Sequence, residues 1–94
     1  VTAIAANAFK NNRVLRKITI PASVKSIGKK AFYGCRSLKT ITVKTTKLTS
    51  KNVGKAAFKG IAKKAVIKVP KSKLKSYRKF LKKKGVPSKA VIRK

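Results

Sequence analysis

The chain repeats a pattern of apolar positions every 23 to 26 residues, and this repeat limits its fold more than any other feature. Residues 27–43, which read IGKKAFYGCRSLKTITV, hold one complete unit. A copy lies 23 positions earlier, a second lies 26 positions later, and a weaker, partial copy follows after another 25 positions. A unit of this length cannot bury its apolar face alone, so successive units are expected to stack as the coils of a solenoid.

Small or apolar residues occupy the positions that match between units. The matching sets are Ile4, Ile27 and Val53; Ala8, Ala31 and Ala57; Phe9, Phe32 and Phe58; Ile18, Ile41 and Ile67; and Ile20, Val43 and Val69. Polar and apolar residues alternate at the end of each unit, which predicts a short strand there. Because stacked units place their strands side by side, we expect the Phe rings to form a buried column and not an exposed platform for bases or sugars.

Two segments resemble the BspA-type leucine-rich repeat of bacterial surface proteins. AFYGCRSLKTITV, preceded by SVKSIG, is similar to one unit of that family, and ITIPASVKSIG at residues 18–28 is similar to the joint between two units. The resemblance covers residues 1–70, and the tail VPKSKLKSYRKFLKKKG also looks like the C-terminal ending of such proteins. The resemblance implies an exported, multi-repeat protein that serves in adhesion and has no catalytic residues.

The predicted fold class is α/β, a short right-handed leucine-rich-repeat solenoid with parallel strands. A single domain is expected over residues 1–94, with the repeat coils in residues 1–70 and a cap of one amphipathic helix and a final strand in residues 71–94. The open end of a solenoid exposes apolar side chains and unpaired strand edges, so it needs such a cap. Residues 90–92 are expected to return as a fourth parallel strand.

The predicted helix has one apolar stripe. The residues at helical spacing are Leu74, Tyr77 and Leu81, with Phe80 at the edge of the stripe. Ser72 as a capping residue, or Pro70 as the first helical residue, is expected to start the helix. Gly85 is placed to end it in a left-handed conformation, which brings Val86 against Leu81.

Two further features concern the ends of the units. Residues 44–52 are polar and three residues longer than the matching segment of the preceding unit, so they are expected to bulge outward as a loop.

The pattern at Val1 matches the pattern at Val24, so the chain begins inside a unit. We therefore expect upstream repeats of a longer parent chain.

The chain contains 28 Lys and Arg residues and no Asp, Glu or His, which gives a formal net charge of +28. Like charges on a compact body oppose folding, and no carboxylate side chain is present to offset them. The composition also lacks the usual groups for acid–base catalysis, catalytic triads and metal sites. The chain is therefore expected not to be an enzyme and to need no cofactor. The single Cys35 is expected to be a small buried residue and not a reactive thiol.

The basic residues are the candidate binding residues, because a field of one sign attracts polyanions by itself. Strand stacking places Lys68 beside Arg93, where a bound anion would relieve their repulsion, and the helix adds a second basic face. The predicted polyanion-binding residues are Lys68, Lys71, Lys75, Arg78, Lys79, Lys82, Lys83 and Arg93. Only five of the 28 basic residues are Arg, which favours binding by charge over the reading of bases.

We expect an extracellular or cell-surface module for adhesion whose partners are anionic polymers, either teichoic acids of the cell wall or sulfated glycans of a host. Nonspecific nucleic-acid binding is the alternative, since charge alone does not separate it from the first function, although no DNA- or RNA-binding motif is present. Membrane disruption by the basic helix is a third candidate function, and a purely structural repeat cap without a ligand is a fourth. No apolar run is long enough to span a membrane.

Overall fold

The computed structural model describes residues 2–94, and Val1, which the sequence places in the first repeat unit, lies outside them. Short strands alternate with tight turns over most of the chain, and a helix and one more strand follow. The strands are β1 (Ala3–Ile4), β2 (Lys17–Ile20), β3 (Ser26–Ile27), β4 (Thr40–Val43), β5 (Val66–Lys68) and β6 (Val91–Arg93). The helix α1 (Leu74–Leu81) lies between the 3₁₀ turns η1 (Lys71–Lys73) and η2 (Lys82–Lys84).

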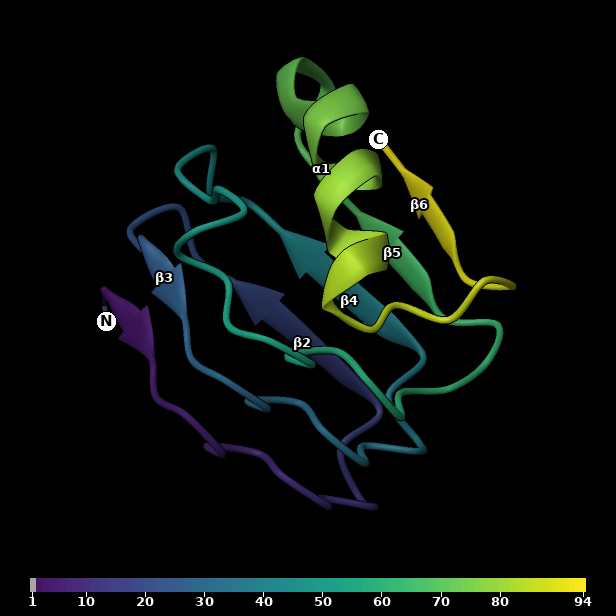
Figure 1. Ribbon diagram of the computed structural model, residues 1–94. Helices are drawn as coiled ribbons and strands as arrows, with labels where there is room; N and C mark the ends of the chain where they lie inside the picture. The colour runs from purple at the N-terminus through teal and green to yellow at the C-terminus, as the bar shows by residue number, and fades with distance from the viewer. Residues whose placement is uncertain (1) are drawn as a thin grey trace.

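Four strands form a parallel sheet in the order β2, β4, β5, β6, and β1 pairs with β3 in a second, two-stranded sheet (Figure 1). Two rows that cross the larger sheet are Ile18, Ile41, Ile67 and Ile92, and Thr19, Thr42, Lys68 and Arg93. An isolated bridge from Ile27 to Val53 extends the pairing of β3. Each pairing joins residues that are 23 to 26 positions apart, so the repeat sets the register, and the predicted parallel strands are confirmed.

A column of stacked rings runs through the coils. The ring centroids of Phe9 and Phe32 lie 5.4 Å apart with an interplanar angle of 3°, and those of Phe32 and Phe58 lie 5.4 Å apart with an angle of 11°. This separation is within the range of favourable offset stacking. Phe32 and Phe58 are fully buried, whereas Phe9 at the first coil is half-buried. The predicted column is therefore confirmed, with one end more open than the other.

The tight turns of successive units share one backbone geometry. Asn7, Lys30 and Ala56 match one another in the repeat, and their φ angles are 61°, 57° and 58°. A second matching set with positive φ is Asn11 at 59°, Gly34 at 75° and Gly60 at 87°. Residues with a Cβ rarely adopt this left-handed region because the Cβ crowds the following carbonyl oxygen. Two such residues in each unit reverse the chain between the smaller and the larger sheet.

The helix α1 has eight residues and buries one face against the coils. Tyr77, Phe80 and Leu81 are buried and Leu74 is half-buried, as the apolar stripe predicts. The edge of the Phe80 ring meets the Tyr77 ring at an interplanar angle of 78°. No helix among residues 2–94 has the length and apolar character that a membrane crossing requires.

The end of the helix follows the prediction. Gly85 has a φ of 103°. The Gly85 N–H donates to the Lys82 carbonyl and the Val86 N–H to the Leu81 carbonyl, each at 3.4 Å. This pair of bonds is the Schellman arrangement, which satisfies carbonyls that a helix end leaves unpaired.

The start of the helix differs from the prediction. Pro70 precedes η1 and does not sit at its first position, and its carbonyl accepts the N–H of Lys73 at 2.9 Å. Neither η1 nor α1 has a side-chain cap hydrogen bond, so the capping role expected for Ser72 is wrong. The burial of the apolar stripe therefore holds the helix in place without a cap.

Residues 44–52 fold back toward α1, which corrects the expectation that they bulge outward. Thr45 is fully buried and Leu48 is 4% exposed. The Thr45 hydroxyl donates to the Val24 carbonyl at 2.6 Å. The Tyr77 hydroxyl donates to the Thr45 carbonyl at 2.8 Å and accepts the N–H of Leu48 at 3.3 Å. Buried hydrogen bonds thus join this loop to the helix, and the polar composition of the loop does not reveal them.

Candidate polyanion-binding surface

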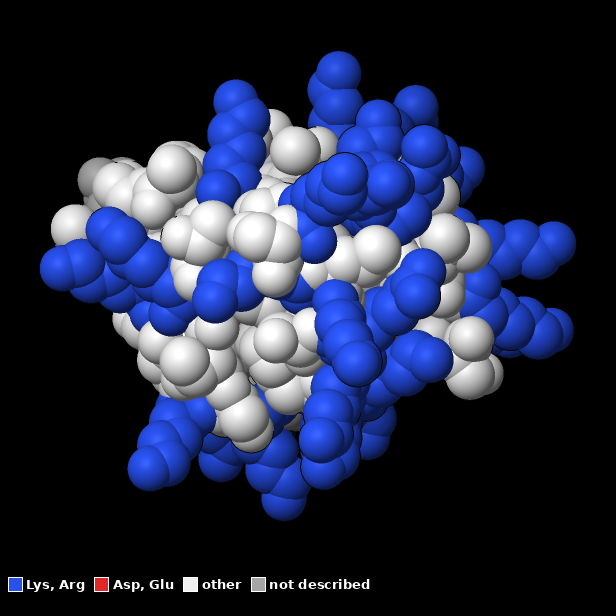
Figure 2. Space-filling view, turned by 90° about the horizontal axis from the view of Figure 1, so that it is seen from above, with Lys and Arg blue, Asp and Glu red and all other residues white. Residues whose placement is uncertain are grey.

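Cationic side chains lie on most sides of the molecule in Figure 2, with areas of uncharged residues between them. The sequence has no Asp or Glu, so no carboxylate side chain offsets this charge. All eight predicted binding residues are exposed. A surface of this kind produces a field of one sign, which concentrates anions around it.

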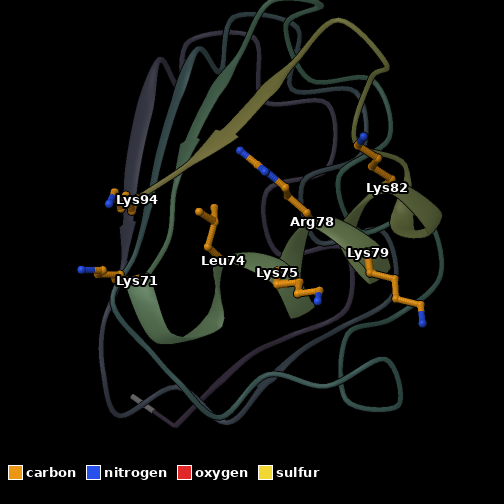
Figure 3. A pocket seen from close by; sticks show the side chains of 7 residues that line it. All are labelled: Lys71, Leu74, Lys75, Arg78, Lys79, Lys82 and Lys94. Carbon is orange, nitrogen blue, oxygen red and sulfur yellow. The ribbon is translucent and has the colours of Figure 1, made fainter.

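A groove of about 820 Å³ runs along α1 and brings several of the predicted residues together (Figure 3). Its lining consists of Lys71, Leu74, Lys75, Arg78, Lys79, Lys82 and Lys94. Six of these seven residues are cationic, and five of the six belong to the predicted set. The groove therefore presents a row of positive charges along the helix with one half-buried apolar side chain, Leu74, between them.

Arg78 connects the helix to the last strand. Its Nε–H donates to the Ile92 carbonyl at 3.1 Å, and Figure 3 shows its side chain directed toward β6. Lys75 and Lys79 point away from that strand in the same view. The hydrogen bond through Nε leaves the two terminal nitrogens of the guanidinium for a ligand. A guanidinium oriented in this way suits two-pronged contact with a phosphate, sulfate or carboxylate group.

Sequence reasoning missed two residues of the groove. Leu74 belongs to the apolar stripe, but it lies at the start of α1 and stays half-buried. Lys94 follows β6, and Figure 3 shows it at the same end of the groove as Lys71. The position of Lys94 could have been predicted from the fourth strand, because that strand brings the C-terminal residue close to the start of the helix.

The remaining predicted residues lie outside the groove lining. Lys68 and Arg93 occupy paired positions on β5 and β6, as the repeat predicts, and both are exposed. Lys83 lies in η2 and is exposed as well. The predicted set therefore divides into five groove residues, a pair on the sheet, and Lys83 apart from both.

Cys35 is fully buried, and its Sγ donates to the Phe9 carbonyl at 2.9 Å. Burial raises the pKa of the thiol above its ordinary value of 9.0, and a backbone hydrogen bond with Asn12 acts in the opposite direction. The prediction of a small buried residue is confirmed. A neutral, buried thiol is a poor nucleophile.

Comparison with known proteins places the chain in a family. No curated protein and no solved structure matches it significantly. The family model described as the BspA type leucine rich repeat region, with 6 copies, matches residues 2–83. The match runs past residue 70, where the resemblance seen in the sequence ends, and it includes all of α1. The chain belongs to the BspA-type leucine-rich repeat family.

Proposed function

We propose that the chain is a non-enzymatic module of an extracellular or cell-surface repeat protein for adhesion, and that its basic surface binds anionic polymers such as teichoic acids and sulfated glycans. Membership of a family that typically occurs on bacterial surfaces supports the location. The charge of +28 without any acidic side chain supports the class of partner. The absence of Asp, Glu and His from the sequence supports a binding role over a catalytic one.

We also infer the architecture that presents this surface, a short right-handed solenoid closed by α1 and β6. Parallel strands joined by a crossover connection are almost always right-handed. The buried Tyr77 and Leu81 support closure, because they cover apolar residues that an open last coil would expose. The polymer-binding surface then lies at the closed end.

The groove along α1 is the observation that carries the polymer-binding proposal. Lys71 and Lys94 lie at one end of it and Lys82 at the other, so a linear polymer with a charge on each unit contacts several cations at once (Figure 3). Each contact releases counterions, and the contacts together give affinity that falls steeply with salt. Leu74 adds a small apolar contact between the charges.

Titration of the protein with purified teichoic acid and with heparin, at low and at high salt, tests the proposal. Binding is expected at low salt, with an affinity that decreases linearly on logarithmic axes as salt increases. No binding to either polymer at low salt would end the proposal. Competition with double-stranded DNA tests the nucleic-acid alternative, which gains support if DNA displaces both polymers at equal charge.

A matched pair of variants tests the role of the groove. Lys75, Lys79 and Lys82 are replaced by Gln in the first variant, and the exposed residues outside the groove, Lys25, Lys44 and Lys64, are replaced by Gln in the second. Both variants lose three charges. The groove variant is expected to bind heparin and teichoic acid about tenfold more weakly than the control variant. Equal losses would show that the overall charge acts without the groove.

A further inference from the structure

The stacked turns carry a column of outward residues in which two positions are lysine and one is tyrosine. Lys10, Tyr33 and Lys59 match one another in the repeat, at separations of 23 and 26 residues. Tyr33 is half-buried and lies between these two lysines in the stack. The other aromatic rings either form the Phe column or pack together beneath α1. Tyr33 therefore places one aromatic ring in a field of lysines.

Tyr33 lines two hollows of about 260 Å³ each. One hollow includes Ala56, which stands where the preceding unit has Lys30. The other includes Gly34 and Gly60, which have no side chain. All three of these small residues have positive φ, so the turn geometry that favours small residues also leaves space beside the ring.

Cations surround the Tyr33 ring on several sides. Those that line the two hollows are Lys29, Lys30, Lys55, Lys59, Arg13 and Arg36. The Nζ atoms of Lys10 and Lys30 lie 5.9 and 5.3 Å from the ring centroid, within the range of cation–π attraction. These two Nζ atoms lie over the ring, so a ligand that stacks on Tyr33 displaces them and meets them, with the cations of the hollows, around its own edge.

We propose that Tyr33 stacks against a sugar ring of an anionic glycan whose carboxylate or sulfate groups contact the surrounding Lys and Arg side chains. This inference rests on the proposed function and assigns a ligand class to it. A pyranose carries such groups on the ring itself, so its charges reach cations at the edge of the site while its C–H face covers the aromatic ring. A nucleobase carries its charge several bonds away, and proteins that bind single strands stack successive bases on several aromatic residues. One isolated ring surrounded by cations fits the glycan better.

Two substitutions that keep the net charge test the proposal. Tyr33→Ala removes the ring, and Tyr33→Phe keeps it. A heparin-derived oligosaccharide is the probe, and inorganic polyphosphate with the same number of charges, which has no ring to stack, is the control ligand. Tyr33→Ala is expected to bind the oligosaccharide about five- to tenfold more weakly, while polyphosphate binding changes by less than about twofold. Tyr33→Phe is expected to bind both ligands as the natural chain does.

Tyrosine fluorescence gives an independent readout, because the only other tyrosine, Tyr77, is fully buried. The oligosaccharide is expected to change the emission of the natural chain and not that of Tyr33→Ala. Circular dichroism checks that this variant is folded, as its half-exposed site predicts.

Four results would overturn the inference. Unchanged oligosaccharide binding by Tyr33→Ala, or equal losses for both ligands, rejects stacking on a sugar and leaves general polyanion binding intact. A single-stranded oligodeoxynucleotide serves as a third ligand, and a Tyr33→Ala loss confined to it replaces the glycan with a nucleobase. Failure of the natural chain to bind any of these polyanions at low salt rejects the proposed function together with this site.

Discussion

Ala56 has a φ of 58°, a left-handed conformation in which its Cβ crowds the backbone. This conformation costs about 1–2 kcal/mol for a residue with a Cβ, and the greater freedom of Gly in the unfolded chain offsets about 0.5–1 kcal/mol of any gain. Ala56→Gly is therefore expected to raise the free energy of unfolding by about 0.5–1 kcal/mol. Urea denaturation at fixed salt measures the change.

Ala57 is the matched control for that substitution. It is the next residue in the chain, is fully buried, and does not have a positive φ. Ala57→Gly is expected to lower stability, because it adds backbone freedom and removes a buried methyl group. A loss of stability in both variants would show that the left-handed turn at Ala56 carries no strain.

Tyr77 joins two segments that are distant in the sequence. Tyr77→Phe keeps the buried ring and removes the hydroxyl, which leaves the Thr45 carbonyl and the Leu48 N–H without their partner. An unpaired buried polar group costs about 1–3 kcal/mol, so this variant is expected to lose stability in that range at neutral pH. Urea denaturation measures it, and an unchanged midpoint would contradict the hydrogen-bonded bridge.

The same hydroxyl predicts a pH dependence. Burial raises the pKa of Tyr77 above its ordinary value of 10.0, and the hydrogen bond from the Leu48 backbone acts in the opposite direction. The stabilisation from the neutral phenol is therefore complete below pH 10.0 and is lost as pH rises through the pKa of the folded state. The stability difference between the natural chain and Tyr77→Phe is expected to shrink above pH 10.0, whereas a constant difference would contradict the raised pKa.

Among the elements, the stability of α1 depends on Gly85, the residue that ends the helical segment after η2. Gly85 has a φ of 103°, and a Cβ added there would lie 2.6 Å from the backbone nitrogen of Lys59. Gly85→Ala therefore combines a left-handed strain with an overlap, and it is expected to cost about 2 kcal/mol or more. Thermal melting followed by circular dichroism measures the loss. Ser76→Ala, at an exposed position of α1, is the control and is expected to stay within about 0.5 kcal/mol.

The elements that follow from regular spacings in the sequence were predictable. The strands, the Phe column and the apolar stripe of α1 each repeat at a period that a sequence displays directly. The path of residues 44–52 was not predictable, because the loop bonds through the Leu48 N–H to Tyr77, which lies 29 residues away. A polar segment is normally read as an exposed loop, and here a tertiary hydrogen bond overrides that rule.

The residues of the candidate site divide in the same way, into those that the sequence predicts and those that only the tertiary structure brings together. The helical period places five of the predicted cations along α1 and its two flanking 3₁₀ turns, and these residues do line one groove. Lys94 joins them only because β6 returns beside the helix. The hollows beside Tyr33 depend on Ala56 and Gly60, which come from the next unit of the repeat. Stacking therefore creates sites that no single unit contains.

For the molecule as a whole, self-repulsion is the dominant electrostatic effect. Its principal extents are 30 × 26 × 20 Å, and the net charge of +28 lies within that volume. The Debye length falls from about 30 Å at 0.01 M salt to about 10 Å at 0.1 M, so added salt screens charges across the molecule. The melting temperature is expected to rise by about 5 °C or more over this range.

Calorimetry in sodium chloride measures that rise. The variant in which Lys25, Lys44 and Lys64 are replaced by Gln is expected to melt at a higher temperature at low salt and to respond less to added salt, because it has fewer like charges. A melting temperature that does not depend on salt would contradict the view that repulsion limits stability.

By itself the sequence determined the repeat, the register of the strands, the ring column and the sign of the surface, because the first three depend on residues 23 to 26 positions apart and the last depends on composition alone. The tertiary structure alone decided the burial of Thr45 and Leu48, the presence of Lys94 in the groove and the open space beside Tyr33. These depend on which segments meet in space. In a chain without acidic residues, no pattern of opposite charges marks those meetings in advance, so packing and buried hydrogen bonds decide them.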